Sequence, residues 1–284
     1  MKNILPLLLF AVPFLSTAAP AADKGIYGRD DRKDIFEAAP AHRKLARSVA
    51  AVMSGDMVPE NGLVKLDLHD FKTAFSLCDS ERFGDQPADS FCTASLVGPD
   101  LMLTAGHCVA SAAACRDKKF IFGYEMGAGG EWPDLLPAAD IYSCAEVLVT
   151  TNNGTEDFAV VRLDRPVTGR EPLAVDRSGP PAPGDEVFAI GTPLGLPLKV
   201  ADNAHVRTVG VDSFISDLDT FGGNSGSPVF NAGGLIAGVL IAGGQDLAVR
   251  DGVCVISYVT AQNEGDGEWA ASASQFARHI PRTR

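Results

Sequence analysis

Basic residues are scarce in this sequence relative to acidic ones. The 24 Lys and Arg against 36 Asp and Glu give a formal net charge of -12. A surface that neutralises nucleic-acid phosphates is basic, so nucleic acid is not the expected partner. Aromatic residues are also few, at 7%, whereas 29 Gly and 18 Pro favour the many turns of an all-β protein with short strands. The 46% of hydrophobic residues is enough for a large core and excludes a disordered chain.

Beyond the N-terminus, the sequence has no apolar run of the about 20 residues that a membrane span takes. At the N-terminus, Lys2 precedes a shorter apolar run at 4–15, which two prolines interrupt, and small residues follow up to Ala22. This order is typical of a secretory signal peptide. We expect residues 1–21 to be removed after Ala21, which leaves a secreted or periplasmic protein that is free of the membrane.

No two cysteines have the C-x-x-C spacing that is common in metal sites and redox motifs. An even number of cysteines in an exported chain favours disulfides, and no metal is expected. Six cysteines allow 15 pairings, so the spacing alone leaves the connectivity open. The six are Cys78, Cys92, Cys108, Cys115, Cys144 and Cys254.

Long helical patterns are missing as well. Short apolar or alternating runs between Gly, Pro, Asn and Asp predict about a dozen strands, and therefore a barrel or a sandwich. These runs lie at 48–53, 63–68, 93–97, 101–104, 119–122, 146–150, 158–163, 186–190, 205–209, 227–230, 235–242 and 253–258. One helix is predicted at 272–280, where apolar residues share a face.

Two segments have no strand pattern. Residues 22–47 are rich in charge and predict either a pro-segment or an ordered arm laid over a domain. Residues 167–183 are rich in Pro and Gly and lie near the middle of the chain, which predicts a linker between two domains.

Three short segments place a reactive residue among small or turn-forming neighbours. LTAGHC puts His107 directly after an apolar strand, where a general base is accessible to substrate. EDFAVVRL begins a buried strand with Asp157, whose carboxylate can orient an imidazole. FGGNSGSP carries Ser225, a nucleophile once a base takes its proton. The glycines before Ser225 free the backbone, so the amides of Gly223 and Ser225 are predicted to form an oxyanion hole.

The order of these residues in the chain is informative. It runs His, Asp, Ser, whereas α/β-hydrolases run Ser, Asp, His and subtilisins run Asp, His, Ser. The order therefore favours the chymotrypsin arrangement. Three other carboxylates compete for the Asp position, but Asp157 is favoured because a strong apolar run follows it. The competitors are Asp134, Asp140 and Asp164.

The three segments together resemble the motif blocks of trypsin-like (chymotrypsin-fold) serine proteases. These blocks are TAGHC around His107, DFAVVRL from Asp157 and GGNSGSPVF around Ser225. The bacterial secreted branch that includes glutamyl endopeptidases is the most similar, since it also has Asn before the serine. The resemblance extends over about residues 48–260, and it implies a secreted serine endopeptidase.

The resemblance implies an all-β fold of two six-stranded antiparallel β-barrels with the active site in the cleft between them. The first barrel, 48–166, would carry the His and the Asp, and the second, 184–284, would carry the Ser and end in a short helix. It also implies a disulfide between Cys92 and Cys108, and it leaves the other four cysteines unassigned. We expect a monomer that needs no cofactor and acts on protein or peptide substrates.

Substrate preference is predicted from one acidic residue. In trypsin-like enzymes, the residue six before the nucleophile forms the floor of the pocket for the side chain preceding the cut bond. Here it is Asp219, which would pair with Arg or Lys. The histidine that glutamyl endopeptidases use for acidic side chains is missing from 237–244. Alternatively, Asp219 points into solvent or binds backbone, and Thr220 and Gly243 shape the pocket.

An extended substrate also needs a strand edge to pair with. The residues expected to offer it are Ile241, Ala242 and Gly243.

Activation is expected to differ from that of pancreatic-type enzymes. Those enzymes have Asp just before the serine, and it receives a newly formed N-terminal amine. This chain has Asn224 there, so other contacts, or docking of residues 23–47, would order the oxyanion loop. The alternative to an endopeptidase is a non-catalytic binding protein on the same fold, which the intact His, Asp and Ser disfavour.

Overall fold

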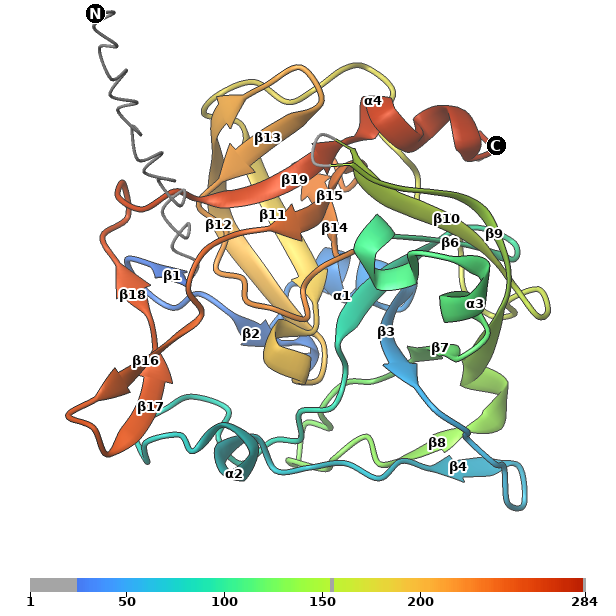
Figure 1. The fold of residues 1–284 in the computed structure, drawn as a ribbon, viewed down its shortest axis with the longest axis horizontal. Coiled ribbons are helices and arrows are strands. Elements are labelled where there is room, and N and C mark those ends of the chain that lie inside the picture. Colours follow the sequence, from blue (N-terminus) through green and yellow to red (C-terminus); the bar gives the residue numbers. More distant parts are fainter. Residues whose placement is uncertain (1–24, 154–155, 283–284) are drawn as a thin grey trace, which may run out of the picture.

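Two antiparallel β-barrels lie side by side in the computed structural model, which describes residues 25–153 and 156–282 (Figure 1). The expected signal peptide at 1–21 lies outside the described residues. Among the described helices, none is both long enough and apolar enough to cross a membrane.

The first barrel closes from six strands in the order β10-β6-β5-β3-β7-β9. The strands are β3 (Val49–Ser54), β5 (Cys92–Gly98), β6 (Leu101–Thr104), β7 (Lys118–Phe122), β9 (Ile141–Asn152) and β10 (Asp157–Leu163). All of β5 and β6 is buried, because one face fills the barrel and the other packs against neighbouring elements. Between these strands lie the 3-10 helices η2 (Gly106–Val109) and η3 (Ala138–Asp140) and the helix α3 (Ala112–Cys115).

The second barrel has the order β11-β14-β15-β19-β13-β12, and pairing of β11 with β12 closes it. Its strands are β11 (Glu186–Gly191), β12 (Lys199–Val209), β13 (Ser213–Ser216), β14 (Pro228–Asn231), β15 (Ile236–Ala242) and β19 (Glu268–Ser272). The predicted C-terminal helix forms as α4 (Ala273–Phe276) and continues as the 3-10 helix η5 (Ala277–His279). Its Phe276 packs 5.9 Å from the ring of Phe158 in the first barrel, so one apolar cluster joins the two barrels.

The fold confirms two barrels, with differences in the second. All six strands of the first barrel lie on predicted runs, whereas β13 and β19 of the second lie on none. The predicted runs 63–68 and 253–258 form strands outside the barrels, β4 (Leu63–Lys65) and β17 (Cys254–Ser257). These strands pair with β8 (Leu135–Pro137) and β16 (Leu247–Arg250).

Three disulfides connect the six cysteines. Cys92 pairs with Cys108, the pair that the family resemblance implies, and Cys115 pairs with Cys144 inside the first barrel. Cys78 follows α2 (Phe71–Phe75) and pairs with Cys254 at the start of β17, 176 residues away. This bridge ties a long loop of the first barrel to the β16–β17 hairpin of the second.

The N-terminal arm, residues 22–47, is described from Gly25 and lies along the second barrel (Figure 1). Its β1 (Ile26–Tyr27) pairs with β18 (Val259–Thr260), and its β2 (Lys33–Asp34) pairs with the edge of β12. The 3-10 helix η1 (Ile35–Glu37) and the helix α1 (Pro40–Ala46) then lead into β3. The arm is therefore an ordered part of the fold.

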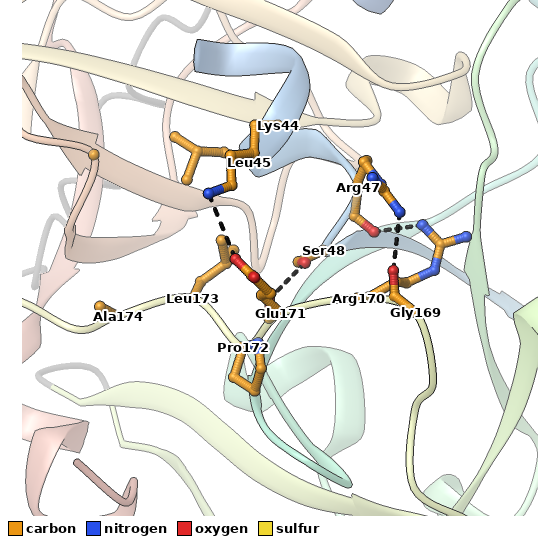
Figure 2. Close-up of a pocket in the computed structure, with 11 residues that line it drawn as sticks. Lys44, Leu45, Arg47, Ser48, Gly169, Arg170, Glu171, Pro172, Leu173 and Ala174 are labelled. Atoms are coloured by element: carbon orange, nitrogen blue, oxygen red, sulfur yellow. Dashed lines mark hydrogen bonds and ion pairs between the residues drawn. The ribbon is translucent and has the colours of Figure 1, made fainter. Parts of the chain in front are cut away.

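The segment 167–183 contains no strand and runs past the end of α1. There Ser48 Oγ donates to the carbonyl of Glu171 at 2.7 Å, and Arg47 donates to the carbonyl of Gly169 at 2.9 Å (Figure 2). A pocket of about 320 Å³ lies between these residues. None of the predicted site residues lines it, so it is separate from the candidate active site.

Candidate active site

His107 and Asp157 form a directly bonded pair. The Nδ1 atom of His107 lies 2.7 Å from Oδ2 of Asp157, and the backbone N–H of His107 donates to Oδ1 at 3.0 Å. The imidazole is 35% exposed and the carboxylate 15%. With Nδ1–H donating to the carboxylate, the other ring nitrogen, Nε2, is left to accept a proton.

The sheet register brings this pair together. β10 pairs with β6 so that Ala159 lies opposite Thr104, which places the start of β10 beside the turn after β6. In that turn, a Cβ on Gly106 would overlap the carbonyl oxygen of Thr151, so the close approach requires glycine. The competing carboxylates bind elsewhere: Asp140 pairs with Arg170 at 2.7 Å, and Asp164 pairs with Arg165 at 3.1 Å.

Ser225 lies at the junction between the barrels, in the turn before β14. Its carbonyl accepts from the amide of Thr93 in β5 at 2.8 Å and lies 3.6 Å from Sγ of Cys108, the neighbour of His107. Gly226 then has φ +87°, and a Cβ there would overlap the carbonyl oxygen of Thr93. The turn therefore sits next to the His107 turn. No hydrogen bond joins the Ser225 hydroxyl to the His107 ring within the described residues, and such bonds are often long before substrate binds.

The oxyanion loop, residues 221–225, presents two unused amides. Among the described residues, no acceptor binds the N–H of Gly223 or of Ser225. The peptide that contains the Gly223 N–H is fixed at its other end, because the carbonyl of Gly222 accepts from the amide of Leu194 at 2.5 Å. Gly223 has φ +85°, a backbone conformation that glycine adopts without strain. Two amides held free of protein acceptors can stabilise an oxyanion.

Sequence reasoning missed the residues that hold this loop. The hydroxyls of Thr93 and Thr192 donate to the carbonyl of Gly223 at 3.0 and 3.1 Å. The carboxylate of Asp246 accepts from the amide of Gly222 at 2.8 Å. No motif marks these side chains, because each belongs to a different strand or loop and meets the others only in the folded protein.

Asn224 is buried, with 3% of its surface exposed. Its Oδ1 accepts from the hydroxyl of Ser227 at 3.4 Å, and its amide N–H donates to the carbonyl of Phe221 at 3.0 Å. A Cβ on Gly191 would approach the same Oδ1 at 2.5 Å. The side chain is neutral, so an ion pair with an N-terminal amine cannot form at this position.

The structure gives Asp219 a different environment from the expected one. The side chain is 5% exposed, and both of its carboxylate oxygens accept from amides of the N-terminal arm. The partners are the N–H of Tyr27 and the N–H of Asp31, each at 2.8 Å. Burial raises the pKa of Asp219 to about 7, against the opposing effect of these two hydrogen bonds. This corresponds to the backbone-binding alternative for Asp219.

The other expected substrate-binding residues differ in exposure. Thr220 is 1% exposed, and its hydroxyl donates to the buried carboxylate of Glu268. Ala242 is exposed, and Ile241 and Gly243 are half-buried. The pairing of β15 with β14 ends at Val239, and Leu240 still bonds to Gly226 and Ser227. Beyond Leu240, no described residue pairs with this edge at Ile241 and Ala242. That edge can pair with an extended peptide.

One cluster has the residue types of a metal site but not the chemistry. The potential ligand atoms of Cys92, His107 and Cys108 lie within 4.8 Å of one another. Because the two sulfurs are joined in a disulfide, they offer no thiolate to a metal ion.

Comparisons with known proteins identify the family and the fold of the chain. The family model of the trypsin-like peptidase domain matches residues 92–239, just over half of the chain. The chain belongs to the trypsin-like peptidase family. The match spans the His107, Asp157 and Ser225 segments of this trypsin-like peptidase chain. A search of curated protein sequences finds no match.

Two solved structures show the same fold at low identity. A Glu endopeptidase in complex with MPD is 17% identical, with a TM-score of 0.54 over 89% of this chain and 98% of its own. The active form of a protease from M. tuberculosis is 15% identical, with a TM-score of 0.51 over 97% and 96% of the two chains. The trypsin-like peptidase domain of this chain therefore has the chymotrypsin fold.

Proposed function

We propose that this protein is an exported serine endopeptidase that cuts peptide bonds with a His107–Asp157–Ser225 triad. The observation that carries the proposal is the bonding of Asp157 to both the ring and the backbone of His107, at 2.7 and 3.0 Å. This geometry orients the imidazole toward its role as a base. Three disulfides fit an oxidising compartment outside the cytoplasm.

In the proposed mechanism, His107 Nε2 takes the proton of the Ser225 hydroxyl while Oγ attacks the substrate carbonyl. The developing oxyanion accepts from the amides of Gly223 and Ser225. Asp157 stabilises the imidazolium, which then gives its proton to the leaving amine. Water, activated by the same imidazole, hydrolyses the acyl-enzyme and returns Ser225 to its starting state.

The preference for basic side chains remains a prediction, and the geometry around Asp219 disfavours it. Both carboxylate oxygens already accept hydrogen bonds from the arm. An incoming Arg or Lys would compete with these two amides for a group of which only 5% is exposed. Extended substrates are proposed to pair with the open edge at Ile241, Ala242 and Gly243.

Digestion of a peptide library tests both the activity and the preference. Cleavage by the wild-type protein and none by Ser225→Ala supports the endopeptidase. A folded wild type that binds peptides without cutting them supports instead a non-catalytic binding protein on this fold. Cleavage mainly after Arg and Lys would support a substrate-facing Asp219, and cleavage after other residues would contradict it.

A further inference from the structure

The N-terminal arm bonds to the segment that leads into the oxyanion loop. Gly25 forms an antiparallel bridge with Thr220. The next strand of the arm, β1, pairs with β18, which follows the β16–β17 hairpin in the chain (Figure 1). A Cβ on Gly25 would overlap the carbonyl oxygen of Tyr258, so the arm fits tightly between these two segments. The arm therefore lies against the segment that leads into the nucleophile turn.

Asp219 is the polar anchor of this contact. Its Oδ1 accepts from Tyr27 and its Oδ2 from Asp31, so a single carboxylate spans a five-residue stretch of the arm. A buried carboxylate without such donors is costly, and arm amides without an acceptor are costly as well. The arm and Asp219 therefore satisfy each other.

Arg32 of the arm is a second anchor, and it contacts Phe221, which lies two residues after Asp219 in the chain. Its guanidinium lies 4.4 Å from the ring centroid of Phe221, the first residue of the oxyanion loop. Arg32 is 3% exposed and Phe221 1%, so this cation–π contact is desolvated, which strengthens it. Asp30 holds the guanidinium at 2.9 Å, and Arg82 donates to the carbonyl of Arg32 at 2.8 Å.

These anchors connect to the oxyanion amides through the backbone. The carbonyl of Phe221 accepts from the amide of Asn224 at 3.0 Å, which closes the turn that contains Gly223. Movement of Phe221 would shift this turn and misdirect the N–H of Gly223. In enzymes that use an N-terminal amine, an ion pair with Asp orders this loop, whereas here the corresponding residue is the neutral Asn224.

We propose that the N-terminal arm remains part of the active enzyme, and that Asp219 and Arg32 are positioning residues that hold the oxyanion loop in its catalytic geometry. This inference rests on the proposed serine endopeptidase function. It assigns Asp219 to the arm rather than to the substrate pocket. It also makes residues 25–37 a requirement for activity instead of a pro-segment to be removed.

The test measures the rate at which a fluorophosphonate labels Ser225 in the full chain, together with kcat and KM on peptide substrates. The variants are Asp219→Ala, Asp219→Asn, Arg32→Ala and Arg32→Lys. Lys33→Ala is the matched control, because Lys33 lies on the same arm but pairs with Asp202, away from the loop. Thermal unfolding and circular dichroism establish that each variant is folded.

Asp219→Ala and Arg32→Ala are expected to lower labelling and kcat at least tenfold on every substrate, with KM little changed. Removing one oxyanion donor outright lowers kcat by about 10²- to 10³-fold, which sets the upper range. The conservative variants should retain more activity than the alanine variants, and Lys33→Ala should match wild type. If an alanine variant fails to fold, the labelling rate and kcat of the corresponding conservative variant are compared with wild type instead, and a smaller decrease is expected.

Two results would overturn the inference. One is labelling within twofold of wild type in both the Asp219 and the Arg32 variants. The other is a loss in Asp219→Ala that is confined to cleavage after Arg and Lys, with Arg32→Ala unaffected, which would return Asp219 to the substrate pocket.

The N-terminus of the labelled wild-type protein gives an independent reading. Sequencing should find a start at or before Gly25, and a start beyond Arg32 in labelled protein would exclude a retained arm. Absence of labelling in wild type itself would instead refute the endopeptidase, so the two proposals fail in distinguishable ways.

Discussion

Lys199→Met tests how strongly the N-terminal arm is held to the second barrel. Lys199 lies on β12 with its side chain 1% exposed, and its Nζ is 2.8 Å from Oδ1 of Asp34 on β2. Nζ also donates to Oε1 of Gln86 at 2.7 Å and to the carbonyl of Pro197 at 2.9 Å. Burial lowers the pKa of Lys199 to about 8, because the charged ammonium is shielded from water.

The magnitude follows from what the substitution leaves behind. Methionine fills much of the volume, but the Asp34 carboxylate stays buried, with its side chain 7% exposed and its cation gone. Breaking a buried ion pair in this way costs about 3–5 kcal/mol. Gln86 still donates to Oδ2 of Asp34 at 2.9 Å, which favours the lower end of that range. A loss of about 3 kcal/mol corresponds to a fall in Tm of about 6–12 °C for a protein of this size.

Urea unfolding followed by tryptophan fluorescence measures this loss, with Lys33→Met as the control. Lys33 on β2 pairs with Asp202 on β12 at 2.8 Å, so this pair joins the same two strands as Lys199 and Asp34. The Lys33 side chain is 38% exposed, and an exposed pair contributes at most about 1 kcal/mol. Equal losses in the two variants would refute the argument from burial.

The double variant Asp34→Leu/Lys199→Met separates the pair from its packing. With both charges replaced by apolar groups, no uncompensated charge remains, and the double variant should be more stable than Lys199→Met alone. A double variant that is less stable than the single one would contradict this reasoning. If Lys199→Met does not accumulate as folded protein but the double variant does, the conclusion is the same.

Three further predictions concern the active site. Asp157→Asn should lower kcat by about 10⁴-fold with little change in KM, because the wrong imidazole tautomer then faces Ser225; a fall below tenfold would contradict the triad. Gly226→Ala should unfold at lower urea and lose fluorophosphonate labelling, since its Cβ would overlap the carbonyl of Thr93 at φ +87°. Burial raises the pKa of Asp219 to about 7 from an ordinary value of 3.8, so its contribution to stability is full below pH 3.8 and lost as pH rises through about 7. The urea midpoint of wild type should therefore fall more between pH 5 and pH 8 than that of Asp219→Asn. Equal falls in the two proteins would exclude the raised pKa.

The three candidate segments could be recognised in the sequence because each is local. A strand, a turn of small residues and a reactive side chain are adjacent in the chain at His107, at Asp157 and at Ser225. The first barrel could be predicted for the same reason, since its strands are continuous apolar runs. In the second barrel, β13 (SFIS) and β19 (EWAAS) contain Ser, Ala and Glu, which do not favour strands by themselves. Pairing with their neighbours makes them strands.

The environment of Asp219 could not be predicted, because its partners are far away in the chain. The amides of Tyr27 and Asp31 are 192 and 188 residues from it. The spacing of Cys78 and Cys254 is similarly long, at 176 residues. Long-range contacts of this kind depend on how the arm and the loops lie over the barrels, and no local pattern encodes them.

The central claim is that Ser225, activated by His107, is a nucleophile. The most direct measurement is covalent labelling of the folded wild-type protein by a fluorophosphonate, with the modified residue located by mass spectrometry. We expect labelling at Ser225, loss of labelling in Ser225→Ala and a strongly reduced rate in His107→Ala. Folded wild-type protein that takes up no label, or that is labelled equally when Ser225 is replaced, would contradict the claim.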